Sequence, residues 1–158
     1  MNCNEKLRDI IRYILLYYPY NSELNKTRLT KLVYLIDWEV AKKYNESCSG
    51  INWYFDNYGP YVQDVMKTAS SDERIKITEE TSHYGGVKYI FQLEKSKNLE
   101  FKYLSEKEYR IIDSVIEETK DMSFNNFINY VYNTPPVIKT PKGHSLDLIK
   151  ISSEISTE

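Results

Sequence analysis

The sequence predicts an α+β fold, with about five helices around a buried central helix and a small antiparallel sheet of about three strands. Helical spacing of apolar residues recurs along the chain. One such segment, residues 27–44, is apolar on two faces, which is typical of a helix buried between layers. Residues 51–56, 75–78 and 87–93 instead alternate apolar and polar side chains, as half-buried strands do.

Signals at the ends of these segments support the order of elements. In residues 5–18 the apolar side chains follow helical spacing, and Pro19 ends the helix. Tyr58-Gly59-Pro60 breaks the first strand, and Pro60 is predicted to begin a short third helix that ends near Ser70. Gly85-Gly86 lies between the last two strands and favours a hairpin.

Two further helices are predicted in the second half of the chain. Ser105 and Glu108 form the S-x-x-E capping-box pattern at the start of a helix over residues 105–121, which holds six acidic and three basic residues. Ser123 is predicted to cap the last helix, which Pro135-Pro136 ends.

Length and composition favour one small domain. A chain of 158 residues corresponds to one domain of about 150 residues, and we expect residues 1–151 to form it and residues 152–158 to fray. No apolar run reaches the ~20 residues that cross a bilayer, so an integral membrane protein is not expected. The absence of a signal-peptide pattern and of a disulfide framework predicts a cytoplasmic protein.

The residues that carry most enzyme and metal chemistry are few and scattered. Cys3, Cys48, His83 and His144 are the only cysteines and histidines, and they show no metal-ligand spacing. No glycine-rich phosphate loop is present. We therefore expect no enzyme, no metal and no cofactor. Asp37 interrupts the apolar central helix, so its carboxylate needs a partner if it is buried.

Aromatic residues crowd into residues 53–61. On a strand, alternate side chains face opposite ways, so some of these aromatics belong to the core and others face outward. Exposed tyrosine and tryptophan are the residue types that anchor protein interfaces. Core packing and partner binding are both open interpretations of this cluster.

Three basic residues suggest an alternative function. Lys26, Arg28 and Lys31 cluster where the second helix begins, and a hairpin over residues 84–88 could serve as a wing, as in a winged-helix-like DNA-binding regulator. Against this stand the net charge of −2 and the apolar character of that helix, so nucleic acid is an unlikely partner.

Two short motifs resemble a known family. Residues 29–38, LTKLVYLIDW, resemble the "L-x-K-L-x-Y-x-x-x-W/Y" helix of the Panacea (SocA-like) antitoxin domain family. Tyr58-Gly59-Pro60 is similar to the "Y-G-P" turn of that family, and Val62 and Val65 match the apolar positions that follow. The resemblance covers about residues 5–70 and implies a compact α+β domain with no catalytic residues.

The resemblance also implies a function. Members typically neutralise a toxin encoded beside them by binding it directly, and at least one type acts as an adaptor that presents its toxin to a protease. We therefore expect an antitoxin-like protein whose partner is a cognate toxin, with a protease as second partner if it is an adaptor. Exposed aromatics would also permit a homodimer. The candidate partner-binding residues are Trp53, Tyr54, Tyr58, Gly59, Pro60 and Tyr61.

Overall fold

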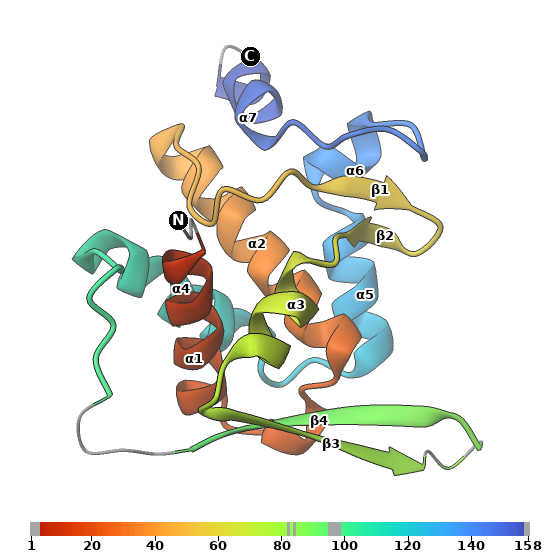
Figure 1. Ribbon diagram of the computed structural model, residues 1–158. Coiled ribbons are helices and arrows are strands. Elements are labelled where there is room, and N and C mark those ends of the chain that lie inside the picture. Colours follow the sequence, from red (N-terminus) through yellow and green to blue (C-terminus); the bar gives the residue numbers. More distant parts are fainter. Residues whose placement is uncertain (1–3, 82, 84, 95–98, 157–158) are drawn as a thin grey trace.

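The computed structural model describes residues 4–81, 83, 85–94 and 99–156 (Figure 1). The helices are α1 (Glu5–Tyr17), α2 (Lys26–Tyr44), α3 (Asp64–Ser71), α4 (Glu106–Thr119), α5 (Phe124–Tyr132), α6 (Pro135–Lys139) and α7 (Leu148–Ser156), with a 3-10 turn, η1 (Asn21–Glu23), before α2. The strands are β1 (Tyr54–Asp56), β2 (Gly59–Tyr61), β3 (Ile75–Thr81) and β4 (Val87–Leu93). In these residues no helix is long and apolar enough to cross a membrane.

The predicted α+β class is confirmed, although the strands are arranged differently from the expected single sheet. Within the described residues they form two separate antiparallel hairpins, β1–β2 and β3–β4. Both hairpins contact the central helix, one through β2 and the other through β4. Figure 1 shows them at different ends of the molecule, with the helices between them.

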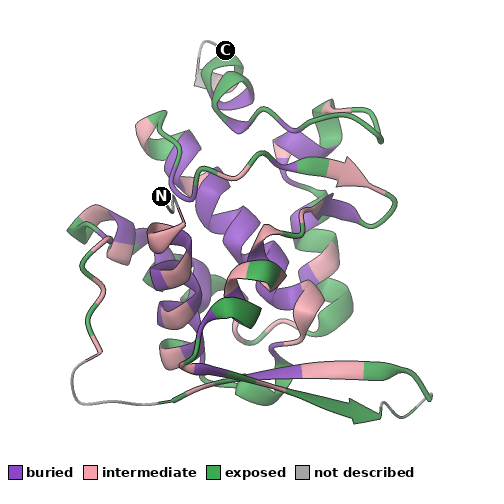
Figure 2. Cartoon of the chain, viewed as in Figure 1, coloured by how far each residue is buried: buried purple, intermediate pink, exposed green. Residues whose placement is uncertain are grey.

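The central helix α2 organises the fold. Every residue from Arg28 to Trp38 is buried, and Figure 2 shows α2 in the interior of the molecule. It contacts α1, α3, α4, α5 and α7. The side chain of Asn25 caps the helix by accepting a hydrogen bond from the Arg28 backbone N–H at 2.8 Å. A helix enclosed on all sides needs apolar residues around its circumference, which is the two-faced pattern of the sequence.

The predicted caps of the later helices are confirmed. Ser105 and Glu108 form the complete capping box at the start of α4. Ser123 Oγ accepts a hydrogen bond from the backbone N–H of Asn126 at the start of α5. Pro135 lies in the first turn of α6, where its missing N–H leaves no hydrogen bond unmade.

The prediction that Pro60 begins a helix is wrong. Asp56 pairs with Gly59, and Phe55 pairs with Pro60, so the chain reverses over two residues and Pro60 belongs to β2. Helix α3 begins only at Asp64. Proline is tolerated in a short edge strand because that strand need not donate every backbone hydrogen bond.

The C-terminal part of the chain closes the other side of the first hairpin. Residues 143–146 run beside β1: the Gly143 N–H donates to the Phe55 carbonyl oxygen at 2.7 Å, and the Leu146 N–H donates to the Trp53 carbonyl oxygen at 2.9 Å. The strand β1 therefore has hydrogen-bonded neighbours on both sides. This pairing leads the chain into α7.

The prediction that residues 152–158 fray is wrong for the described residues. Helix α7 continues to Ser156, and its residues Leu148, Ile151 and Ser152 are buried. The helix packs on α2, so the end of the chain contributes to the core. The amphipathic spacing of this segment was present in the sequence but is short.

We expect Ile151→Ala to lower the free energy of unfolding by about 2–4 kcal/mol, because the side chain is 7% exposed and the change leaves a cavity against α2. Ile149→Ala is a matched control on the same helix, since Ile149 is 36% exposed, and it should cost less than about 1 kcal/mol. Urea denaturation measures both. Equal costs would show that α7 does not pack as described.

Candidate partner-binding surface

A row of polar side chains on α2 holds the β1–β2 hairpin. Lys31, Tyr34 and Asp37 lie three residues apart, so they share one side of the helix. The ammonium of Lys31 donates to the Pro60 carbonyl oxygen at 3.4 Å. The Tyr34 ring packs edge-to-face on the Trp53 indole, with 5.6 Å between ring centroids. All three belong to the segment that resembles the family helix, so these motif residues position the hairpin.

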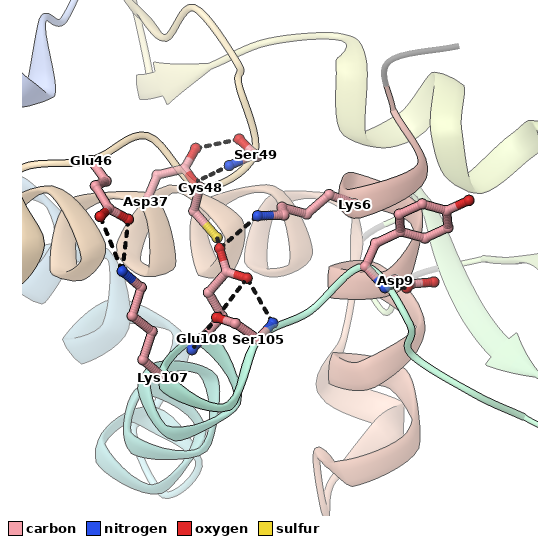
Figure 3. A network of polar contacts seen from close by, with 10 residues as sticks. Lys6, Asp9, Asp37, Glu46, Cys48, Ser49, Ser105, Lys107 and Glu108 are labelled. Carbon is pink, nitrogen blue, oxygen red and sulfur yellow. Dashed lines mark hydrogen bonds and ion pairs between the residues drawn. The ribbon is translucent and has the colours of Figure 1, made fainter. Parts of the chain in front are cut away.

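Asp37 is the most enclosed member of this row. Its carboxylate accepts hydrogen bonds from the Ser49 backbone N–H at 2.9 Å, from the Ser49 hydroxyl, and from the Trp53 indole N–H at 2.7 Å (Figure 3 shows the two Ser49 bonds). Burial raises the pKa of Asp37, and these three donors oppose the rise. The expectation that a buried Asp37 needs partners is confirmed.

A second polar group joins α1, α4 and the loop after α2. Glu108 is buried and accepts from the Lys6 ammonium at 2.8 Å, from the Ser105 backbone N–H at 2.9 Å, and from the Cys48 thiol at 3.4 Å (Figure 3). Glu108 is the one acidic residue of the helix over 105–121 that is buried among the described residues. Its position in the capping box places its carboxylate against Cys48 in the loop after α2.

This polar network holds its one thiol in the protonated form. Burial, with the charges of Asp37 and Glu108, raises the pKa of the Cys48 thiol far above its ordinary value, so the thiolate nucleophile is suppressed. No group of three His, Cys, Asp or Glu side chains among the described residues could hold a metal ion. The network therefore acts as a structural connection between elements.

The aromatics of the hairpin divide between core and surface. Trp53 is 1% exposed, so the prediction that its side chain faces a partner is wrong: the indole N–H is instead bound to Asp37. Tyr54 and Tyr58 are exposed, at 44% and 75%. Tyr61, the cross-strand neighbour of Tyr54, is partly exposed, and its ring lies 5.8 Å from the Lys26 ammonium. These three tyrosines remain available to a partner.

Gly59 is buried beneath a tyrosine of α5. A Cβ atom at this position would lie 2.5 Å from Cε1 of Tyr132, and the backbone φ of +94° is one that L side chains rarely adopt. Pro60 is also buried. Gly59 and Pro60 of the "Y-G-P" turn were candidates for partner binding, yet their side-chain positions face the protein itself. They bring Tyr132 against the hairpin.

Helix α5 extends the surface that begins at the hairpin. Phe124, Ile128 and Tyr132 are four residues apart and share one side of α5, where Phe124 is 45% and Tyr132 is 36% exposed. Phe124 also lines a groove of about 720 Å³ between the start of α2 and β4, which Lys26 lines too. We call the following residues the hairpin–α5 surface: Tyr54, Tyr58, Tyr61, Phe124, Ile128 and Tyr132.

The sequence analysis did not predict the α5 part of this surface, although the composition of the segment indicates it. Residues 122–138 contain no charged side chain, in a chain of which 28% is charged. Loss of charged residues together with aromatic enrichment is the compositional mark of an interface core. Phe124 is 45% exposed because its side of the helix continues past the core.

The structure excludes two of the three basic residues that were predicted to contact nucleic acid in the alternative function. Arg28 and Lys31 are each 2% exposed, so neither can contact a phosphate backbone in this fold. The guanidinium of Arg28 donates to the Tyr18 hydroxyl at 2.8 Å and to the Met122 carbonyl oxygen at 3.1 Å. Only Lys26 of the predicted basic cluster is partly exposed. The prediction of a basic DNA-binding helix start is therefore wrong.

Comparison with known proteins identifies the family. The family model described as antitoxin SocA-like, Panacea domain matches residues 29–136, about two thirds of the 158-residue chain. The chain belongs to the SocA-like antitoxin family with the Panacea domain. No curated protein and no solved structure matches the chain. The Panacea match begins within α2 and ends within α6, so it contains the polar row and every residue of the hairpin–α5 surface.

The buried lysine of the Panacea motif makes stability depend on pH. Burial lowers the pKa of Lys31 from 10.5 to about 8, and Asp56 opposes this shift. Between these values the unfolded chain binds more protons than the folded one, so the free energy of unfolding rises with pH. From about pH 7.5 to about pH 9.5 the rise attributable to Lys31 is on the order of 2 kcal/mol. Urea denaturation of wild type and Lys31→Met at both pH values isolates this contribution of Lys31. An equal change in the free energy of unfolding between the two pH values in both proteins would contradict the prediction.

We expect Gly59→Ala to destabilise the domain by about 2 kcal/mol or more, from the positive φ and the overlap with Tyr132. Gly85→Ala is the matched control, because Gly85 has a φ of +85° with no atom within 4 Å of an added Cβ, so it should show only the backbone cost of about 1 kcal/mol. In a Tyr132→Ala background the cost of Gly59→Ala should fall to that level. Thermal unfolding measures all four variants.

Proposed function

We propose that this protein neutralises a cognate toxin protein by direct contact through the hairpin–α5 surface, without chemical change to the toxin. The observation that carries the proposal is an exposed aromatic face on a chain of the family described as antitoxin SocA-like. Tyrosine and phenylalanine bury large areas with little loss of side-chain entropy, so such a face suits tight protein binding. We place this encounter in the cytoplasm, where the toxin is synthesised.

Rigid support favours this surface over the other exposed aromatics. Tyr54 and Tyr61 stand on paired strands, and the hairpin is held from below by Lys31 and Trp53. A binding surface on a fixed backbone loses less entropy when the partner docks. The groove beside Phe124 adds a concave region in which a partner side chain can be enclosed.

The acidic helix α4 supplies a further part of the proposal. Glu106 and Glu117 are each paired with a basic residue of the same helix region, whereas Glu118 and Asp121 are exposed without an ion pair among the described residues. The resulting excess of negative charge would accelerate encounter with a basic toxin. Raising the salt concentration should then slow association more than it speeds dissociation.

Binding should depend on the exposed tyrosines. We expect Tyr58→Ala and Tyr132→Ala each to weaken binding of the toxin encoded beside this protein by about tenfold or more, since each removes an exposed aromatic ring from the surface. Tyr20→Ala is the matched control, because Tyr20 is 46% exposed and lies outside the surface. Surface plasmon resonance measures affinity, and circular dichroism checks the fold. Equal affinity of all three variants with wild type would sink the proposed surface.

The abundance and half-life of the toxin, measured in cells that make this protein, distinguish blocking of the toxin from its delivery to a protease. A blocker leaves the toxin at unchanged or higher abundance in growing cells while its toxicity disappears. An adaptor shortens the half-life of the toxin, and protection is lost when the protease is deleted. We propose the blocker, so a pulse-chase that shows protease-dependent loss of toxin would replace it with the adaptor.

A further inference from the structure

A polar cleft lies apart from the hairpin–α5 surface, between α1 and the junction of α3 with β3. It measures about 570 Å³, which is within the size range of small-ligand sites. Arg8 and Arg12 approach it from α1, Lys67 from α3, and Arg74 from the residue before β3. Four basic side chains from three elements thus converge on one cavity.

One of these arginines forms an ion pair within the protein. Arg12 forms a bidentate ion pair with Asp72, with Nε–Oδ2 at 2.6 Å and Nη2–Oδ1 at 2.7 Å. The backbone N–H of Arg74 donates to the same Oδ1 at 3.0 Å. The Asp72 side chain is 1% exposed, and both of its oxygens are already accepting hydrogen bonds. This pair therefore fixes the floor of the cleft.

The other two arginines carry unused donors. Arg8 Nε and Arg74 Nη1 are buried and have no hydrogen-bond partner among the described residues. A buried guanidinium N–H without an acceptor is costly, so a small movement of either side chain that brings this N–H to an oxyanion in the cleft would be favourable. The Asp72 carboxylate is already engaged by Arg12 and by a backbone N–H, and it accepts no hydrogen bond from the side chain of Arg8 or Arg74.

The charge of the buried layer also favours an anion. Arg8, Arg12 and Arg74 face two buried carboxylates, Asp72 and Asp9, of which Asp9 accepts the Tyr103 N–H at 3.0 Å. Burial alone would raise the pKa of Asp72, but hydrogen bonds from Arg12 and Arg74 and the charges of Arg12 and Arg8 hold it below its ordinary value. Arg12 thus neutralises the charge of Asp72, whereas the guanidinium groups of Arg8 and Arg74 form no ion pair among the described residues.

The rim is mixed. Lys67 adds a positive charge, while Glu5 and Glu73 add two negative charges. No aromatic side chain of the described residues lines the cleft, so these residues offer a nucleobase no ring on which to stack. These features select a small ligand whose anionic group enters deeply and whose remaining part, if present, is polar.

We propose that this cleft binds a phosphate group, either free or carried by a small polar molecule, with Arg8 and Arg74 as its principal donors. A tetrahedral phosphate presents more acceptor oxygens than a carboxylate, which suits two guanidinium groups that approach from different elements. The Arg12–Asp72 pair positions Arg74 and does not contact the ligand. This site is independent of the toxin-binding proposal.

Isothermal titration of the full chain with inorganic phosphate tests the site, with sodium chloride at equal ionic strength as the reference. We expect phosphate to bind the wild type, and Arg8→Gln and Arg74→Gln each to weaken binding by about tenfold or more. Lys76→Gln is the matched control, because Lys76 is exposed on β3 close to Arg74 in the chain and removes the same charge. It should bind phosphate as the wild type does.

Phosphate heat no greater than that of chloride, or equal affinity in all variants, would overturn the proposal. Titration with glycerol phosphate distinguishes the two sources: tighter binding than inorganic phosphate indicates a phosphomonoester, and equal or weaker binding indicates free phosphate. If an arginine variant fails to fold, amide chemical shifts of the wild type decide the question. They should move around residues 8, 12 and 72–74 on addition of phosphate, and movement confined to other regions contradicts the site.

Discussion

The constraint on which the fold depends is the complete enclosure of α2. From Arg28 to Trp38 no residue reaches solvent appreciably, so each polar group in this stretch needs an internal partner. Asp37 has three donors, and Lys31 has a carbonyl oxygen. These partners lie in the β1–β2 hairpin and the loop before it, so satisfying the helix also fixes the hairpin that presents the exposed tyrosines.

Motif and surface therefore play different roles. The motif residues Lys31, Tyr34 and Gly59 are buried and connect helices and strands. The side chains that reach solvent lie at other positions of the hairpin and of α5. A family signature of this kind reports the scaffold rather than the partner.

Much of the helical framework could be predicted from the sequence because capping and periodicity are local properties. Ser105, Glu108 and Ser123 mark helix starts within four residues of themselves. The hairpin β1–β2 could not be predicted, because its strands are three residues long and are stabilised by residues 143–146 from far along the chain. Trp53 was misplaced for the same reason: its burial depends on Asp37, which lies on another element.

The pairing of residues 143–146 with β1 has a consequence for how a partner can approach. An open strand edge invites the backbone of another chain, with little regard for side chains, and is a common route to promiscuous association. Here the C-terminal segment occupies that edge. On the β1 side of the hairpin, recognition is thereby left to side-chain shape. Single substitutions change that shape on a fixed backbone, so this side can be adapted to a new partner without changes to the interior.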